Sequence, residues 1–228
     1  HIIKVPTTLL AFVDASIGIK TGINFEGQRN RLGSYNARFD VLLDTQFIAS
    51  LEKSFIKEGL GEIFKIAIIK SHELFTALEN AERNLLNPKF YLTDAGKIIL
   101  SLSIQLMLEE LHNNPEETIL KRSVDFGHTF SPLVEMETIN KSHHRKLPHG
   151  YAVAYDCLLT SVISKKRGFL PQADLEKIYD LFLLIGFDFN NPIYSDDDLM
   201  WASVLEMTKH RGMNQHIPVP DKIGSFFF

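Results

Sequence analysis

The chain has 228 residues, 45% hydrophobic and 23% charged, which is enough apolar sequence to bury a substantial core in one large or two small domains. Its formal net charge of -4 excludes the basic excess with which proteins neutralise nucleic-acid phosphates. The single cysteine, Cys157, excludes an intrachain disulfide, and we expect it to be a small buried apolar residue.

Membrane and export signals are absent from the sequence pattern. No apolar run reaches the length that spans a bilayer, and the first residues lack the pattern of a signal peptide. We therefore expect a cytoplasmic protein with neither a membrane nor a nucleic-acid partner.

Short strands come first along the chain. Residues 2–5 form a β-branched run that ends at Pro6, and residues 41–43 form a second run after a glycine-rich connection. These features predict an α/β portion over residues 1–58, with the boundary placed where strand-and-loop sequence gives way to helical sequence.

The rest of the chain has helical periodicity. Six segments carry apolar residues at helical spacing: residues 55–69, 73–86, 94–111, 152–166, 173–185 and 196–209. Thr93 and Ser195 stand before two of them as N-cap residues. The pattern predicts an all-helical domain over residues 59–228.

The segment VDASIGIKTGIN, residues 13–24, places a carboxylate, Asp14, and an amine, Lys20, inside apolar sequence with two glycines. It predicts a loop that lines a ligand. Asn30 and Arg31 follow and add groups suited to sugar hydroxyls and phosphate. The alternative is a β-hairpin whose glycines only form turns.

Glu62, His128 and His149 are the strongest chemical signal. One carboxylate and two imidazoles leave coordination positions open on a divalent metal, which a catalytic site requires. Each stands next to a glycine, and we expect these glycines to allow close backbone approach to a bound group. The alternative is three unrelated turns.

Six motifs follow one another along the chain: VPTTLLA, VDASIGIKTGIN, NRLG, GEIFK, VDFGHTFSP and HGYAVA, beginning at residues 5, 13, 30, 61, 124 and 149. In these motifs and their order the chain resembles the sugar phosphate cyclases, the family of dehydroquinate synthase, apart from an insertion of a few residues around 140–146. The resemblance implies a fold of the dehydroquinate synthase type, in which a nucleotide-binding α/β domain precedes an all-α metal-binding domain.

The resemblance also implies roles for individual residues. Glu62, His128 and His149 match the family's zinc ligands, with cobalt as an alternative metal. The family's positions that contact the sugar phosphate or act in catalysis are matched by Asp14, Lys20, Asn30, Lys65, Lys121 and Asp125. Its positions that contact NAD are matched by Thr7, Thr8 and Asp14. Lys121 stands where dehydroquinate synthase has an arginine, which loses bidentate geometry. A homodimer is also suggested.

Departures from dehydroquinate synthase point to one branch of the family. Asp125 replaces an asparagine and Pro132 a histidine, while Leu111, Asp125 and His210 match the 2-epi-5-epi-valiolone synthases. Tyr151 replaces the usual glutamate after the HG pair, and this change next to a ligand could alter metal affinity. The implied substrate is sedoheptulose 7-phosphate. Its oxidation by NAD would permit phosphate elimination, after which the hydride returns and an aldol step closes the ring.

Family members also carry a glycine-rich nucleotide-binding part before the VPTT segment, and the chain contains no GxGxxG fingerprint. We therefore expect a fragment that is inactive alone. Three alternatives stay open: a 3-dehydroquinate synthase, a non-catalytic metal-binding remnant, and a purely structural helical protein.

Overall fold

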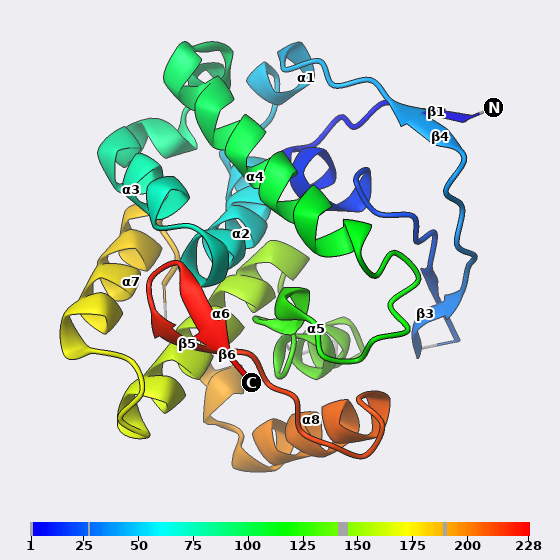
Figure 1. Ribbon diagram of the computed structural model, residues 1–228, viewed down its shortest axis with the longest axis vertical. Helices are drawn as coiled ribbons and strands as arrows, with labels where there is room; N and C mark the ends of the chain where they lie inside the picture. Colours follow the sequence, from blue (N-terminus) through cyan, green and yellow to red (C-terminus); the bar gives the residue numbers. More distant parts are fainter. Residues whose placement is uncertain (1, 27, 141–145, 189–190) are drawn as a thin grey trace.

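The computed structural model describes residues 2–26, 28–140, 146–188 and 191–228 (Figure 1). The α-helices are α1 (Gln46–Ala49), α2 (Lys53–Lys70), α3 (His72–Ala81), α4 (Asp94–His112), α5 (Ser131–Asn140), α6 (His149–Lys166), α7 (Gln172–Leu184) and α8 (Asp197–His210). The strands are β1 (Ile2–Lys4), β2 (Ile23–Phe25), β3 (Gln28–Leu32), β4 (Phe39–Val41), β5 (Val219–Lys222) and β6 (Ser225–Phe227). Short 3-10 or π-helical segments cover Ala11–Ala15, Glu82–Leu86, Pro88–Leu92, Ser123–Asp125 and Pro192–Ser195.

Helix α2 is the centre of the core. From Leu60 to Ile69 every residue is buried, including the charged Glu62 and Lys65. A helix that is apolar on all sides is stable only when other elements surround it. Here α3, α4, α6 and the C-terminal β5–β6 hairpin pack against α2.

Two glycines allow α2 and α6 to pack backbone against backbone. A Cβ on Gly61 would lie 2.0 Å from the carbonyl oxygen of Gly150. The expectation that these glycines face a bound group was wrong, because the space beside them is filled by the neighbouring helix. Gly127 is similar, since its φ is +74° and a Cβ there would lie 2.6 Å from Sγ of Cys157.

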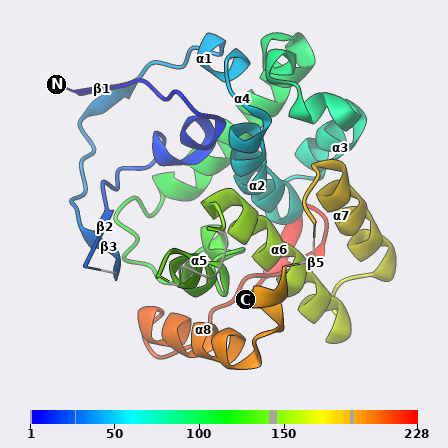
Figure 2. The ribbon, with the colours of Figure 1, turned by 180° about the vertical axis from the view of Figure 1, so that it is seen from behind.

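The N-terminal strands lie along one side of the molecule, opposite α7 (Figures 1 and 2). β1 pairs in parallel with β4, with Ile2 opposite Phe39, and β2 pairs antiparallel with β3. The β1–β4 pair leaves large apolar side chains exposed, among them Ile2 at 49% and Ile3 at 61%. Parallel strands are normally covered on both faces.

The sequence predicted most elements but not all of their limits. All six predicted helices are present, although α6 begins at His149 and α3 ends at Ala81, where a 3-10 segment takes over. The strand predicted at 41–43 lies two residues earlier, as β4. Three elements were not predicted from the sequence: α1, α5 and the β5–β6 hairpin.

Of the two predicted N-cap residues, Thr93 is confirmed and Ser195 is wrong. The hydroxyl of Thr93 accepts the N–H of Gly96 at 3.2 Å and caps α4. At α8 the cap is Asp196, which accepts the N–H of Leu199 at 3.0 Å, and Ser195 belongs to the preceding 3-10 segment. A carboxylate at this position also complements the helix dipole.

The predicted ligand loop is only partly a loop. Residues Ala11–Ala15 form a π-helical turn that packs on α2, because Gly59 lets Leu9 approach closely. The antiparallel β2–β3 pair agrees with the hairpin alternative for the residues that follow. Cys157 is fully buried, as expected. Within the described residues, no helix combines the length and apolar character needed to cross a bilayer.

Candidate metal centre

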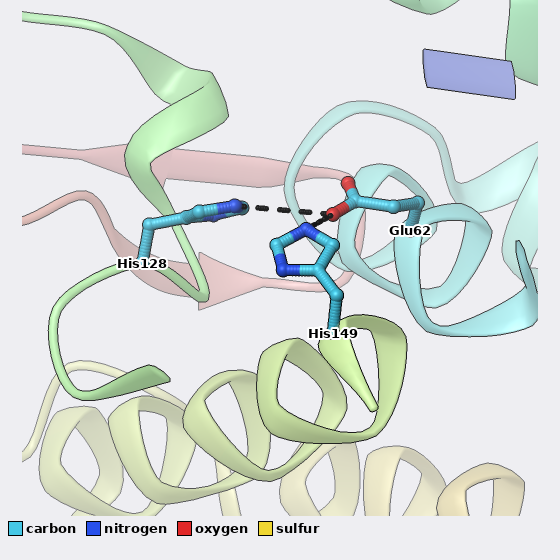
Figure 3. A group of neighbouring side chains, drawn as sticks. All are labelled: Glu62, His128 and His149. Atoms are coloured by element: carbon cyan, nitrogen blue, oxygen red, sulfur yellow. Dashed lines mark ion pairs between the residues drawn. The ribbon is translucent and has the colours of Figure 1, made fainter. Parts of the chain in front are cut away.

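Glu62, His128 and His149 converge from three separate elements (Figure 3). Glu62 comes from the middle of α2, His149 from the first turn of α6, and His128 from the turn before α5. One ligand atom from each residue lies within 4.8 Å of the others. Nε2 of His149 is 3.2 Å and Nε2 of His128 is 3.9 Å from Oε1 of Glu62.

The second ring nitrogen of each histidine is already engaged. Nδ1 of His128 donates to the carbonyl oxygen of Phe126 at 3.1 Å, and Nδ1 of His149 donates to the Glu135 carboxylate at 3.0 Å. These partners can only accept, so both Nδ1 atoms carry hydrogen. In the neutral rings each Nε2 then directs a lone pair at the Glu62 carboxylate, an arrangement of acceptors that a divalent cation would stabilise. The donor set therefore fits zinc.

Charges around Glu62 keep it ionised. Burial alone would raise its pKa, but Lys65 and the two imidazoles outweigh burial and hold the pKa of Glu62 well below its usual value. Lys65 forms an ion pair with this carboxylate. Burial opposes the charge on Lys65, yet Glu62 and Asp14 raise its pKa.

Asp14 and His149 also have altered acidities. Burial and the negative charge of Glu62 raise the pKa of Asp14. Burial disfavours the charged form of His149, but its hydrogen bonds to Glu135 and Glu62 raise its pKa to about 9. In the absence of metal, this imidazole is therefore a cation at neutral pH.

A second charged cluster lies beside the turn that carries His128. Asp125 is buried between two guanidinium groups, with Oδ1 2.6 Å from Arg122 and Oδ2 3.3 Å from Nε of Arg211. Arg122 also pairs with Glu117, and Glu117 pairs with Lys20. Positive and negative side chains thus alternate from Lys20 to the end of α8.

The structure distributes the remaining predicted residues over several places. Thr8 accepts the N–H of Ala11 at 3.2 Å and so caps the helical turn that holds Asp14, while Thr7 is exposed. Leu111 lies in the last turn of α4, near Gly18. The side chain of Asn30, in β3, lies outside the described residues.

Two predicted residues, Lys121 and His210, lie away from the cluster of Glu62, His128 and His149. Lys121 lies on the surface, with Nζ 5.7 Å from the ring centroid of Phe228. The side chain of His210 is 68% exposed and pairs with Glu206 at 3.8 Å. Tyr151, the residue after the HG pair, packs edge-on against Phe187, with ring centroids 5.3 Å apart.

Three residues with contacts at these clusters were not predicted from the sequence: Glu135, Arg122 and Arg211. Glu135 lies on α5, and Ser131 followed by Pro132 is a typical helix start that could have indicated this helix. Arg211 follows the predicted His210 directly, but its partner Asp125 is 86 residues away in sequence. No local pattern signals such a pair.

Two models of one protein family together match residues 1–210 of the chain. The C-terminal model of 3-dehydroquinate synthase matches residues 59–210, and the N-terminal model of the same family matches residues 1–58. The chain belongs to the 3-dehydroquinate synthase family. The candidate ligands Glu62, His128 and His149 and the sugar phosphate cyclase motifs around them agree with this membership.

The chain is similar to named members of this family. The 2-epi-5-epi-valiolone synthase of Streptomyces albus is 42% identical over 99% of the chain, and the 3-dehydroquinate synthase of Dictyoglomus thermophilum is 32% identical over 97%. The solved structure of the 2-epi-5-epi-valiolone synthase of Streptomyces hygroscopicus subsp. jinggangensis 5008, with NAD+ and Zn2+ bound, matches with a TM-score of 0.91. That match has 39% identity and covers 99% of this chain and 61% of the solved one.

The chain spans about half the length of the curated relatives it matches, for example 55% of the Streptomyces albus protein. The matched half includes the triad and the N-terminal strands.

Proposed function

We propose that the chain is the metal- and substrate-binding part of a sugar phosphate cyclase that acts on sedoheptulose 7-phosphate and yields a C7 cyclitol of the 2-epi-5-epi-valiolone type. The observation that carries this proposal is the convergence of Glu62, His128 and His149 within 4.8 Å, with both Nε2 atoms directed at the carboxylate. The similarity to two proteins named 2-epi-5-epi-valiolone synthase supports the choice of branch.

Zinc held by these three residues would act as a Lewis acid on the reacting hydroxyl and carbonyl oxygens, with cobalt as the alternative metal. Lys65 would place a fixed positive charge next to the ligands, because burial and its pair with Glu62 hold the amine in position. Lys20 would bind the substrate or its phosphate once Glu117 is displaced from it.

We further propose that residues 1–58 belong to the NAD-binding part and that residues 59–228 form the helical domain. The proposed boundary lies inside α2, so one continuous helix would join the two parts. Thr7 and Thr8 would contact the cofactor from the segment between β1 and the turn that carries Asp14. NAD would supply the redox chemistry of the reaction.

Zinc binding by the 228-residue chain tests the metal site. We expect one zinc ion per chain in the wild type, and little retained zinc in Glu62→Gln, His128→Ala or His149→Ala after dialysis. Unchanged zinc content in all three variants would favour a purely structural helical protein.

Substrate binding tests the branch without requiring turnover. The zinc-loaded chain should bind sedoheptulose 7-phosphate more tightly than 3-deoxy-arabino-heptulosonate 7-phosphate in isothermal titration. The opposite preference would reassign the chain to 3-dehydroquinate synthase. Zinc binding without affinity for either sugar phosphate would indicate a non-catalytic metal-binding remnant.

A further inference from the structure

Helix α5 is joined at its start to α6 and near its end to the segment just before α6. At its start, the carboxylate of Asp156, on α6, accepts the N–H groups of Phe130 and Ser131 at 2.6 and 2.9 Å. Near its end, the hydroxyl of Thr138 accepts the N–H of Leu147, two residues before His149, at 3.1 Å. Because His149 lies in the first turn of α6, these connections hold α5 in a defined position relative to that ring.

Glu135 lies between these two connections, one turn before Thr138. Its Oε2 accepts from Nδ1 of His149 at 3.0 Å. A carboxylate cannot donate to the ring, so this contact selects the tautomer with hydrogen on Nδ1 and leaves Nε2 as the metal-binding atom. That atom is the one 3.2 Å from Oε1 of Glu62.

The two histidines are oriented by partners of different charge. His128 donates to the neutral carbonyl of Phe126, whereas His149 donates to the carboxylate of Glu135. A carboxylate accepts a stronger hydrogen bond than a carbonyl and transfers more electron density to the ring. The Nε2 atom of His149 should therefore be the stronger donor of the two.

We propose that Glu135 is a positioning residue of the metal centre, which fixes the tautomer and orientation of His149 and increases the basicity of its Nε2. This inference rests on the proposed metal site and not on the identity of the sugar substrate. Glu135 acts through the ligand and does not itself contact the metal.

The test measures zinc affinity of the 228-residue chain by competition with a chelating dye. We expect Glu135→Ala to weaken zinc binding by about 10- to 100-fold, in line with other partners that orient metal ligands. Glu135→Gln should weaken it less, because the amide oxygen can still accept from Nδ1. This second variant also keeps the side-chain volume, so it serves if the alanine variant unfolds.

Glu206→Gln is the matched control. It removes one carboxylate from α8, where Glu206 is 52% exposed and pairs with exposed His210, and it changes the net charge by the same amount. Its zinc affinity should equal that of the wild type. Nitrogen-15 spectra of the zinc-loaded histidine rings add a readout that a merely structural role would not move: the Nδ1 signal of His149 should shift in both Glu135 variants.

Two results would overturn the inference, and they are distinguishable. If His149→Ala loses zinc while both Glu135 variants bind as tightly as Glu206→Gln, the metal site stands and Glu135 does not position its ligand. If the wild type and His149→Ala bind zinc equally, the proposed metal site fails and the role of Glu135 fails with it.

Discussion

Gly150 and Glu58 meet where α6 crosses α2, and a Cβ added to Gly150 would lie 1.9 Å from the carbonyl oxygen of Glu58. The crossing stands one residue from His149 on α6 and one turn from Glu62 on α2. The distance between two of the three candidate ligands is therefore set by how closely these helix backbones approach. A metal site built in this way depends on glycines that contact no metal.

Gly150→Ala should damage both stability and zinc binding. The added methyl group must push α6 away from α2, and overpacking of this kind costs roughly 1–3 kcal/mol or more. The helix shift would also move His149 relative to Glu62. Urea unfolding of the metal-free chain and zinc competition measure the two effects.

Gly18→Ala is the control for this substitution. A Cβ at Gly18 would lie 3.8 Å from Leu111, which is an ordinary van der Waals distance. We expect a change in unfolding free energy within about 0.5 kcal/mol. Equal losses of unfolding free energy in the two variants would show that the close approach of α6 to α2 is not what makes Gly150→Ala destabilising.

Zinc binding should release a proton near neutral pH. The pKa of His149 is raised to about 9 in the metal-free chain, so its Nε2 is protonated at pH values below that and must lose the proton to bind metal. Glu62 contributes no proton, because its pKa lies well below the usual value. Apparent zinc affinity should therefore rise about tenfold per pH unit until the pKa of His149 is reached.

Isothermal titration in buffers of different ionisation enthalpy counts this proton. Release close to one proton per zinc at a pH between 7 and 8 is expected. Proton release near zero, together with a zinc affinity that is flat with pH, would show that His149 is neutral before metal binds.

The Asp125 cluster should respond unequally to loss of its members. Asp125→Asn leaves Arg211, which is 2% exposed, as a buried cation without its counter-charge, and such a loss costs about 3–5 kcal/mol. Arg211→Met should cost less, because Asp125 keeps Arg122 at 2.6 Å. Urea unfolding of the two single variants and the double variant measures the coupling.

His210→Ala provides the comparison on the same helix. Its side chain is 68% exposed and pairs with an exposed glutamate, so the expected change is below about 1 kcal/mol. A larger loss for His210→Ala than for Arg211→Met would contradict the importance given to the buried pair.

His210 and its neighbour Arg211 illustrate which features can be predicted from the sequence and which cannot. The convergence of Glu62, His128 and His149 was predictable because these residue types have a strong metal chemistry and stand in recognisable motifs. Helices α2, α4 and α6 were predictable from apolar periodicity, and Thr93 was predictable as a cap, because these features depend on residues close together in sequence.

Features set by contacts between distant segments were not predictable. The glycines beside Glu62 and His149 suggested space for a ligand, but the space holds the opposing helix backbone. Arg211 and Asp125 form a buried pair only because α8 returns to the His128 turn. The hydrogen bond from His149 to Glu135 depends on α5, which contacts between distant segments hold beside α6.

Asp156 should give the chain a pH-dependent stability between about pH 4 and 6. Burial raises its pKa to about 6, despite hydrogen bonds from Phe130, Ser131 and Thr160. In this pH range the native chain therefore holds a proton at this carboxyl that the unfolded chain has lost. Under linkage, the free energy of unfolding falls as pH rises through the range, and the loss is complete above the native pKa.

Asp156→Asn removes this titration while keeping the shape of the side chain and an oxygen that can accept the two backbone N–H groups. The difference in unfolding free energy between variant and wild type should thus shift in favour of the variant as pH rises from 4 to about 6. Urea unfolding at a series of pH values measures it. Asp196→Asn, at the exposed cap of α8, should keep the wild-type decline. A difference that shifts toward the wild type would mean that the folded chain stabilises the ionised carboxylate, and that the charge on Asp156 strengthens its cap of α5.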